Sequence, residues 1–465
     1  MPTRSRTVTF LHTADWQLGK PFASICDPAK QARVQQERFE AIRCISAVVK
    51  QHRARFVVVA GDLFDSPTPT HATISQAFGA IADLGVPVYA IPGNHDHAGP
   101  DSLWEQAFFQ RERTRLAPNF HLLTAAAPTL VTLGDSGDGP DGVVLLPCPL
   151  LRRHEANDPT TWIRDLDFTA LGDHPRIVIA HGSTAVFSAG DTSRRDEDDA
   201  TGTSFNTIAL DRLPGDDIDY VALGDWHGFT PAGPKAWYAG TPEIDRFPKS
   251  GQEPGHVLCA TVGRGTVPTV TATRTGRLRW LAIDIALDAT LEGPPDDPTA
   301  DAGPSATDAD RHGPSHVDEA LMELTRPQAE GEPGFDGCLA RVGLTGTVSL
   351  AGRAELDRIV ESWRARLVRF DLDDTVRIAP TLAEIHDLAN RPNDPIISRV
   401  ATELIGRLRA GGDAADLDMV RQAIFMLHAL AHPEAASAGS SASRSGKSSC
   451  TAPTTSPSAP GAPAA

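Results

Sequence analysis

The stretch VTFLHTADWQLG (residues 8–19) joins a run of apolar residues to two possible metal ligands. Asp15 follows the run closely, and Gln17 lies two residues further on. A short, nearly continuous apolar run is typical of a strand that is covered on both faces. Carboxylate and amide oxygens bind divalent cations. The stretch therefore predicts a buried strand whose carboxyl end carries a pair of ligands.

Other apolar runs of the same kind follow along the chain, with helix-like stretches between them. They are FVVVAG (56–61), VYAIPG (88–93), VVLLP (143–147), IVIAHG (177–182) and YVALGD (220–225). Phe39, Ile42 and Ile45 recur at helical spacing, and further helices are expected over about 70–84 and 101–115. This alternation of strands and helices predicts a layered α/β domain over residues 1–285.

The chain changes character after this domain. Residues 286–316 are rich in Pro, Gly, Asp and Ala, which predicts an acidic linker or insertion. Residues 317–380 predict a small α+β domain, because the strand-like CLARVGLTGTV (338–348) precedes an amphipathic helix. Residues 381–432 predict two C-terminal helices, over 396–410 and 414–431. Residues 433–465 are mainly Ala, Ser, Pro and Gly, which predicts a disordered tail.

The charge and the cysteines restrict the class of protein. A formal net charge of −17 is unfavourable for a nucleic-acid partner. However, 13 of the 60 acidic residues lie in 286–336 beside only 2 Arg, so much of the negative charge belongs to one segment and the objection is weakened. Six Cys form no CxxC pair, which argues against a disulfide scaffold and a zinc ribbon. The N-terminus has no apolar signal segment, and no run approaches the roughly 20 apolar residues of a membrane span. A cytoplasmic protein is expected.

Groups that can bind a metal ion follow five of the six apolar runs. Asp15 and Gln17 follow the first run. The groups that follow later runs are Asp62 and Asp65 in GDLFD, Asn94, His95 and Asp96 in GNHD, His181 in AHG, and Asp225 and His227 in GDWH. A lone GDxxD is most often a turn, and a lone His is most often a hydrogen-bonded residue. Five such motifs in succession indicate one site, because strand ends in layered α/β folds line a common crevice.

The types of ligand point to a chemistry. Carboxylate, amide and imidazole groups together suit hard to borderline divalent ions. Two such ions about 3.5–4 Å apart can clamp a phosphate and generate hydroxide from water. No P-loop sequence is present, and no Ser, Cys or Lys nucleophile arrangement competes. The pattern predicts hydrolysis of a phosphoester with two metal ions.

The ordered motifs D-x-Q, GDLFD, GNHD, AHG and GDWH resemble the calcineurin-like metallophosphoesterase superfamily. HTADWQLGKPF, GDLFD and YAGTPEIDRF (238–247) are similar to its DNA-repair exonuclease branch, that of the SbcD nuclease subunit. The resemblance implies a β-sandwich flanked by helices, in four layers α/β/β/α, followed by a small α+β capping domain and C-terminal helices.

The resemblance also implies a role for each motif residue. One metal ion would be held by Asp15, Gln17, Asp62 and His227, and the other by Asp62, Asn94, His181 and Asp225. Asp62 would bridge the two ions. His95 would lie near the leaving-group oxygen as general acid or transition-state stabiliser, and Asp96 would orient its imidazole.

Two motif positions depart from the family pattern. The family usually has D-x-H at the first motif and G-H-x-H at the last, where this chain has Gln17 and Asp225. Both exchanges replace nitrogen by oxygen, which predicts a shift in preference from Zn²⁺ toward Mn²⁺, with Mg²⁺ as the other candidate. The alternative interpretation is a site that has lost activity.

Three functions remain open at this stage. The first is a metal-dependent DNA exonuclease or endonuclease in repair, a homodimer paired by resemblance with an SMC-like ATPase of the SbcC type, whose docking site could be the helices at 396–431. The second is a phosphodiesterase for small substrates such as cyclic nucleotides. The third is a catalytically silent subunit that binds DNA ends or a partner. Lys20, Arg152 and Arg153 are candidates for contacts with backbone phosphates, or are simply solvated charges.

Overall fold

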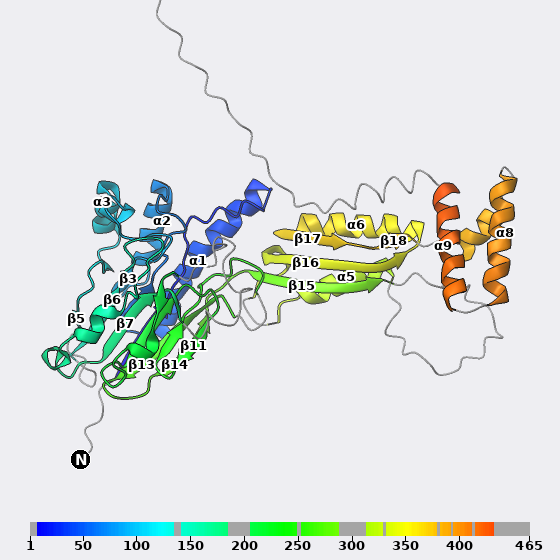
Figure 1. The fold of residues 1–465 in the computed structure, drawn as a ribbon. Helices are drawn as coiled ribbons and strands as arrows, with labels where there is room; N and C mark the ends of the chain where they lie inside the picture. Colours follow the sequence, from blue (N-terminus) through cyan, green and yellow to red (C-terminus); the bar gives the residue numbers. More distant parts are fainter. Residues whose placement is uncertain are drawn as a thin grey trace, which may run out of the picture. The chain divides into compact units, whose positions relative to one another are not determined.

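The computed structural model describes residues 7–133, 141–184, 205–248, 253–287, 313–328, 332–378, 382–391, 394–411 and 414–431 (Figure 1). The chain divides into two compact units, one of residues 1–22 and 29–280 and one of residues 23–28 and 281–465. The expected disordered tail and most of the expected acidic linker lie outside the described residues.

Two six-stranded sheets form the centre of the first unit. The first sheet has the order β14-β13-β1-β2-β3-β4 and the second the order β11-β12-β10-β7-β6-β5. The strands of the first sheet are β1 (Thr7–Thr13), β2 (Val57–Ala60), β3 (Val88–Ile91), β4 (Phe120–Leu122), β13 (His256–Gly263) and β14 (Thr269–Arg274). Those of the second are β5 (Thr129–Thr132), β6 (Gly142–Cys148), β7 (Arg176–His181), β10 (Tyr220–Gly224), β11 (Thr230–Gly233) and β12 (Ala236–Tyr238). A separate short pair joins β8 (Ser183–Thr184) to β9 (Thr207–Ile208).

The strands that carry the motifs run parallel within each sheet. β1, β2 and β3 are parallel neighbours, and so are β7 and β10, in which His181 stands opposite Gly224. The carboxyl ends of parallel strands meet at one edge of a sheet. The loops after these strands are therefore placed together, as the sequence predicted.

Alternate residues of the strands face two different cores, which makes the sheets layers of a sandwich. Phe10, Phe56 and Val58 pack between the sheets with residues of β6, β7 and β10, including Tyr220. Their neighbours Leu11, Val57 and Val59 pack on the other side. This two-sided burial explains why the runs are continuously apolar. Phe10 stacks on Phe56 and meets Tyr220 edge-on across the sandwich.

Helices cover the outer face of the first sheet. They are α1 (Pro28–His52), α2 (His71–Ala82) and α3 (Ala107–Leu116), and their apolar residues share one core with Val57 and Val59 (Figure 1). Short 3₁₀ turns lie on the outer face of the second sheet, at Thr161–Asp165, Phe168–Leu171 and Leu210–Arg212. The fold class, a β-sandwich flanked by helices, is confirmed, with 3₁₀ turns in the described part of the outermost layer.

The second unit begins with a three-stranded sheet of order β15-β16-β17, to which β18 adds at β16. Its elements are β15 (Arg279–Leu287), α5 (Pro314–Thr325), β16 (Cys338–Val348), α6 (Leu350–Arg366), β17 (Arg369–Asp374) and β18 (Arg377–Ile378). The chain divides at Trp280, a few residues before the domain end expected at 285, because Ile285 and Leu287 pack with β16, α5 and α6. Helix α5 begins inside the range expected to be linker.

Three helices end the described chain: α7 (Leu382–Ala389), α8 (Pro395–Ala410) and α9 (Ala414–Ala431). Asp394 caps α8 by accepting a hydrogen bond from the backbone N–H of Ile397, and Pro395 occupies the first helical position. Large apolar side chains of α8 and α9 stay exposed, namely Ile396, Val400, Met419, Met426 and Leu430. Within the part of the chain that the structure describes, no helix has the length and apolar character needed to cross a membrane.

Candidate metal centre

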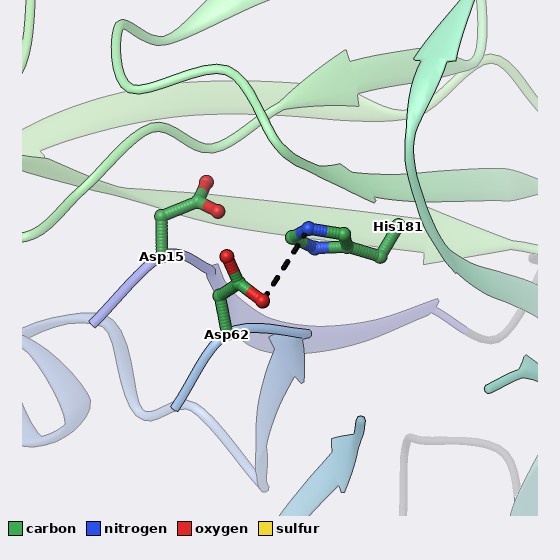
Figure 2. A group of neighbouring side chains, drawn as sticks. All are labelled: Asp15, Asp62 and His181. Carbon is green, nitrogen blue, oxygen red and sulfur yellow. Dashed lines mark ion pairs between the residues drawn. The ribbon is translucent and has the colours of Figure 1, made fainter. Parts of the chain in front are cut away.

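Asp15, Asp62 and His181 point toward one another from both sheets of the sandwich (Figure 2). Asp15 and Asp62 lie in the loops after β1 and β2, and His181 is the last residue of β7. One ligand atom of each residue lies within 4.8 Å of the others, and all three residues are buried. Nε2 of His181 is 3.6 Å from Oδ1 of Asp62.

Asn94 and Asp225 complete this group around the His181 ring. Nε2 of His181 lies 3.0 Å from Oδ1 of Asn94 and 3.8 Å from Oδ1 of Asp225. The other ring nitrogen, Nδ1, donates to the carbonyl of Ala60 at 2.9 Å. This bond directs Nε2 toward the side-chain oxygens of Asp62, Asn94 and Asp225, each of which lies within 3.8 Å of it. We call these four residues the second position.

The second position has an excess of negative charge. Burial of the His181 ring opposes its protonation, but the carboxylates of Asp62, Asp15 and Asp225 outweigh burial and raise the pKa of His181 to about 9. Burial also raises the pKa of Asp15 well above its usual range. The shift of His181 shows that the neighbouring carboxylates favour positive charge at this ring, whereas the shift of Asp15 comes mainly from burial. Two carboxylates, an amide and an imidazole form a donor set that fits a divalent cation.

The other expected ligand set, Asp15, Gln17, Asp62 and His227, is called the first position. Nε2 of Gln17 lies 3.4 Å from Nε2 of His227. Asp15 accepts the backbone N–H of Asp225 at 3.1 Å, which links the loops after β1 and β10. Oε1 of Gln17 accepts a hydrogen bond from Nζ of Lys20 at 2.8 Å.

Asp245 belongs to the site although sequence reasoning did not select it. Nδ1 of His227 lies 3.1 Å from Oδ1 of Asp245, and Nζ of Lys20 lies 2.9 Å from Oδ2. Burial opposes ionisation of Asp245, but His227, Lys20 and Arg246 hold its pKa well below the usual range. A carboxylate that orients a histidine in this way is common behind metal ligands. Asp245 lies in the segment YAGTPEIDRF (238–247), whose only sequence signal is its similarity to the exonuclease branch.

His95 lies beside Asp62, and Asp96 does not orient it as expected. Nε2 of His95 is 3.9 Å from Oδ2 of Asp62, and Nδ1 bonds the carbonyl of Asp65 at 2.9 Å. The Asp96 carboxylate instead accepts the backbone N–H groups of Gly93 at 2.7 Å and Phe64 at 3.0 Å. The expectation for the orienting role of Asp96 is wrong, because its side chain turns back to join the loops after β2 and β3.

The ligand loops hold an uncommon backbone conformation. Asp15, Gln17, Asp62 and Asp225 have positive φ angles of 52°, 41°, 55° and 103°. Such angles are rare for residues with a side chain, and each costs on the order of 1 kcal/mol. Backbone bonds from Asp15 N–H to Gly61 and from Gln17 N–H to Asp62, at 3.2 and 2.9 Å, hold the first two loops against each other. These tight turns place the four side chains in the loops after β1, β2 and β10.

Glycines in the motifs make room for the ligands. A Cβ at Gly61 would lie 2.3 Å from Nδ1 of His181, and one at Gly93 would lie 2.1 Å from Oδ1 of Asp62. A Cβ at Gly224 would lie 2.1 Å from the carbonyl oxygen of Ala60. The glycines of GDLFD, GNHD and GDWH are therefore part of the packing of the site.

Arg38 of α1 is a second residue that sequence reasoning missed. Its buried guanidinium donates to the carbonyl oxygens of Trp16 at 3.0 Å, Asp15 at 3.3 Å and Glu243 at 3.3 Å. Arg38 thereby ties the loop after β1 to the segment that carries Asp245. Its position directly before Phe39, on the buried side of α1, is the only sequence signal for this role that we find.

The fold and this donor set agree with the family comparison. Residues 8–260 match the family model of calcineurin-like phosphoesterases, and the chain belongs to this family. The family is one of metal-dependent phosphoesterases with a centre for two metal ions, and the residues of the second position suit such an ion.

Two of the similar proteins belong to the branch suggested by the sequence. The chain is 26% identical over 266 residues to the SbcD component of the SbcCD nuclease of Bacillus subtilis, covering 52% of this chain and 63% of that protein. The SbcD component of Escherichia coli K12 is 26% identical over 245 residues, 47% and 55% of the two chains. An uncharacterised metallophosphoesterase of B. subtilis, YhaO, is 32% identical over 127 residues, 26% and 29% of the two chains.

These curated relatives are all matched over less than two thirds of their own length. Among solved structures, a dimetal phosphatase from Danio rerio aligns with a TM-score of 0.31 at 12% identity, covering 57% of this chain and 98% of that one.

Proposed function

We propose that this chain is a phosphodiesterase that hydrolyses DNA with two divalent ions, as an exonuclease or endonuclease in DNA repair. The observation that carries the proposal is the meeting of Asp62, Asn94, His181 and Asp225 beside His95. DNA as substrate is supported by the similarity to the SbcD components of the SbcCD nucleases. We propose Mn²⁺ as the preferred metal, because oxygen ligands replace two nitrogens of the usual family set.

The roles of the side chains follow from their placement. Asp62, Asn94, His181 and Asp225 would hold one ion and Asp15, Gln17, Asp62 and His227 the other. When bound, such ions supply a Lewis acid and a hydroxide for phosphoester hydrolysis. His95 donates from Nδ1 to the carbonyl of Asp65, which leaves Nε2 facing the space beside Asp62. There Nε2 would hold the proton for the departing oxygen.

The names of the relatives also support a partner for this chain. The relatives are named as one subunit of the SbcCD nuclease, so we propose that an SMC-like ATPase of the SbcC type is the partner of this chain. The exposed apolar side chains of α8 and α9, such as Ile396 and Met426, would suit such a partner. We further propose that the chain is a cytoplasmic homodimer and that the α+β part of the second unit serves as the capping domain of the family plan.

The test compares two substrates with the same purified chain. End-labelled linear duplex DNA and a small chromogenic phosphodiester are incubated with Mn²⁺ and then Mg²⁺, beside His95→Gln. We expect metal-dependent shortening of the DNA that is lost in His95→Gln, while calorimetry shows unchanged binding of Mn²⁺. Cleavage of the small diester with intact DNA would favour the small-substrate enzyme. Bound ions without cleavage of either substrate would favour the silent subunit.

A further inference from the structure

The two metal positions differ in what surrounds them. At the second position, every group that faces His181 Nε2 at the distances given above is an oxygen ligand. At the first position, a lysine contacts one of the expected metal ligands: Nζ of Lys20 lies 2.8 Å from Oε1 of Gln17 and 2.9 Å from Oδ2 of Asp245. A third carboxylate, that of Asp65, is 3.8 Å from the same nitrogen.

Lys20 determines which way the Gln17 amide faces. An ammonium group only donates hydrogen bonds, so the Gln17 atom next to it must be the oxygen. The amide NH₂ then faces Nε2 of His227 at 3.4 Å. In the reverse orientation the NH₂ would face Lys20, placing two donors against each other. The amide is therefore held with its oxygen on Lys20 and its nitrogen on His227.

The hydrogen bonds close into a ring of four residues. Lys20 donates to Gln17, Gln17 to Nε2 of His227, and Nδ1 of His227 to Asp245, whose other oxygen accepts from Lys20. Arg246 lies 3.2 Å from the same Nδ1, but its N–H groups have the Asp245 carboxylate at 3.0 and 3.2 Å. Each member of the ring has a donor facing an acceptor. The ring uses the Gln17 oxygen and the His227 lone pair that a metal ion would need.

We propose that Lys20 competes with the metal ion of the first position, so that the two positions of this chain differ in affinity. The inference rests on the metal centre of the proposed function and goes beyond it. An ion at the second position binds without disturbing the ring. An ion at the first position binds only after Lys20 releases Gln17 and the amide turns its oxygen inward.

Calorimetric titration of the metal-stripped full chain with Mn²⁺ tests this inference without any substrate. We expect wild type to show one tight and one weaker ion. In Lys20→Met the weaker ion should bind about 10- to 100-fold more tightly, an effect as large as changes next to metal ligands usually have but of opposite sign, because Lys20 competes with the ion. The tight ion should be unchanged. Lys50→Met, at the exposed end of α1, is the matched control and should leave both affinities unchanged.

A second variant guards against an indirect effect. Gln17→His replaces the amide held by Lys20 with an imidazole. This variant should also raise the affinity for the more weakly bound Mn²⁺ ion. Two equally tight ions in wild type, or Lys20→Met with unchanged or weaker binding, would overturn the inference. Binding as expected in a chain that leaves DNA intact would refute the nuclease proposal while supporting the role of Lys20.

Discussion

The ring of His227 is fixed by Asp245, whose Oδ1 lies 3.1 Å from Nδ1 of the histidine. The carboxylate accepts only, so Nδ1 carries the hydrogen and Nε2 keeps the lone pair that faces Gln17. Asp245 also neutralises Lys20 and Arg246, which would otherwise place two positive charges next to a cation site.

Replacing Asp245 by Asn should therefore weaken the binding of the ion at the first position. The amide leaves Lys20 and Arg246 without a counter-charge and orients His227 less firmly. We expect a 10- to 100-fold loss in affinity for the weaker of the two Mn²⁺ ions, measured by calorimetry. Asp216→Asn, an exposed carboxylate of the same unit, is the control. Unchanged affinities in Asp245→Asn would contradict the role of this carboxylate.

Gly93→Ala should damage the second position through sterics alone. The added Cβ would lie 2.1 Å from Oδ1 and 2.5 Å from the backbone nitrogen of Asp62, so the Asp62 carboxylate must move. We expect at least about a tenfold loss of Mn²⁺ affinity and a destabilisation of about 1–3 kcal/mol. Gly79→Ala in α2 meets no atom within 4 Å. That control should be neutral or stabilise by about 0.5–1 kcal/mol. Equal behaviour of the two alanine variants in calorimetry and urea unfolding would sink the prediction.

Arg38→Leu should lower the stability of the first unit and loosen the ligand loop. The carbonyls of Asp15, Trp16 and Glu243 lose their donor, and a buried acceptor without a partner costs about 1–3 kcal/mol. We expect a total loss of about 2–5 kcal/mol in urea unfolding of the metal-free chain. Arg33→Leu lies on the exposed side of the same helix and should change stability by less than about 0.5 kcal/mol. A similar small change in both variants would show that Arg38 has no such role.

His12 should make the stability of the metal-free chain depend on pH. Burial lowers the pKa of His12 to about 3, against 6.5 for an exposed ring, although its bond to Leu223 opposes the shift. Above pH 6.5 both states hold a neutral ring. Below pH 6.5 the unfolded chain binds a proton at His12 that the folded chain does not bind. The free energy of unfolding therefore decreases as the pH is lowered from 6.5 to about 3. His12 should contribute a loss of about 2 kcal/mol between pH 7 and pH 5.

The measurement for His12 is urea unfolding at both pH values, in wild type and in His12→Gln. Glutamine does not titrate, so the difference between the two pH values should shrink by this amount whatever the overall stability of the variant. The same pH difference in both proteins would disprove the assignment to His12.

The strands and the meeting of the motifs could be predicted because both follow from local patterns. Val57 and Val59 face helices while Phe56 and Val58 face the other sheet, so the run is apolar throughout. Parallel neighbours then bring their carboxyl ends together. Strands β5, β11 and β14 escaped prediction, because their exposed or half-buried residues have no strong pattern. The predicted runs also lack β13 (His256–Gly263), although this strand is mostly buried and apolar.

Arg38, Asp245 and Asp96 show why the rest of the site could not be predicted. The partners of Arg38 and Asp245 lie far away in the sequence, and a charged residue within a helix or loop is usually at the surface. Asp96 is next to His95 in the chain, which suggested a contact. The turn at Gly93 instead directs its carboxylate to two backbone N–H groups, a direction that residue spacing does not specify.

The backbone N–H of Asp225 meets the carboxylate of Asp15 across 210 residues of chain. On the ribosome the N-terminal strands emerge first, and the nascent polypeptide then holds Asp15 and Asp62 without their partners. His181, Asp225 and the Asp245 that steadies His227 follow only late in synthesis of this unit. The set of side chains proposed to hold the metal ions is therefore complete only when nearly the whole unit has been translated, so a prematurely terminated product lacks His181, Asp225 and Asp245.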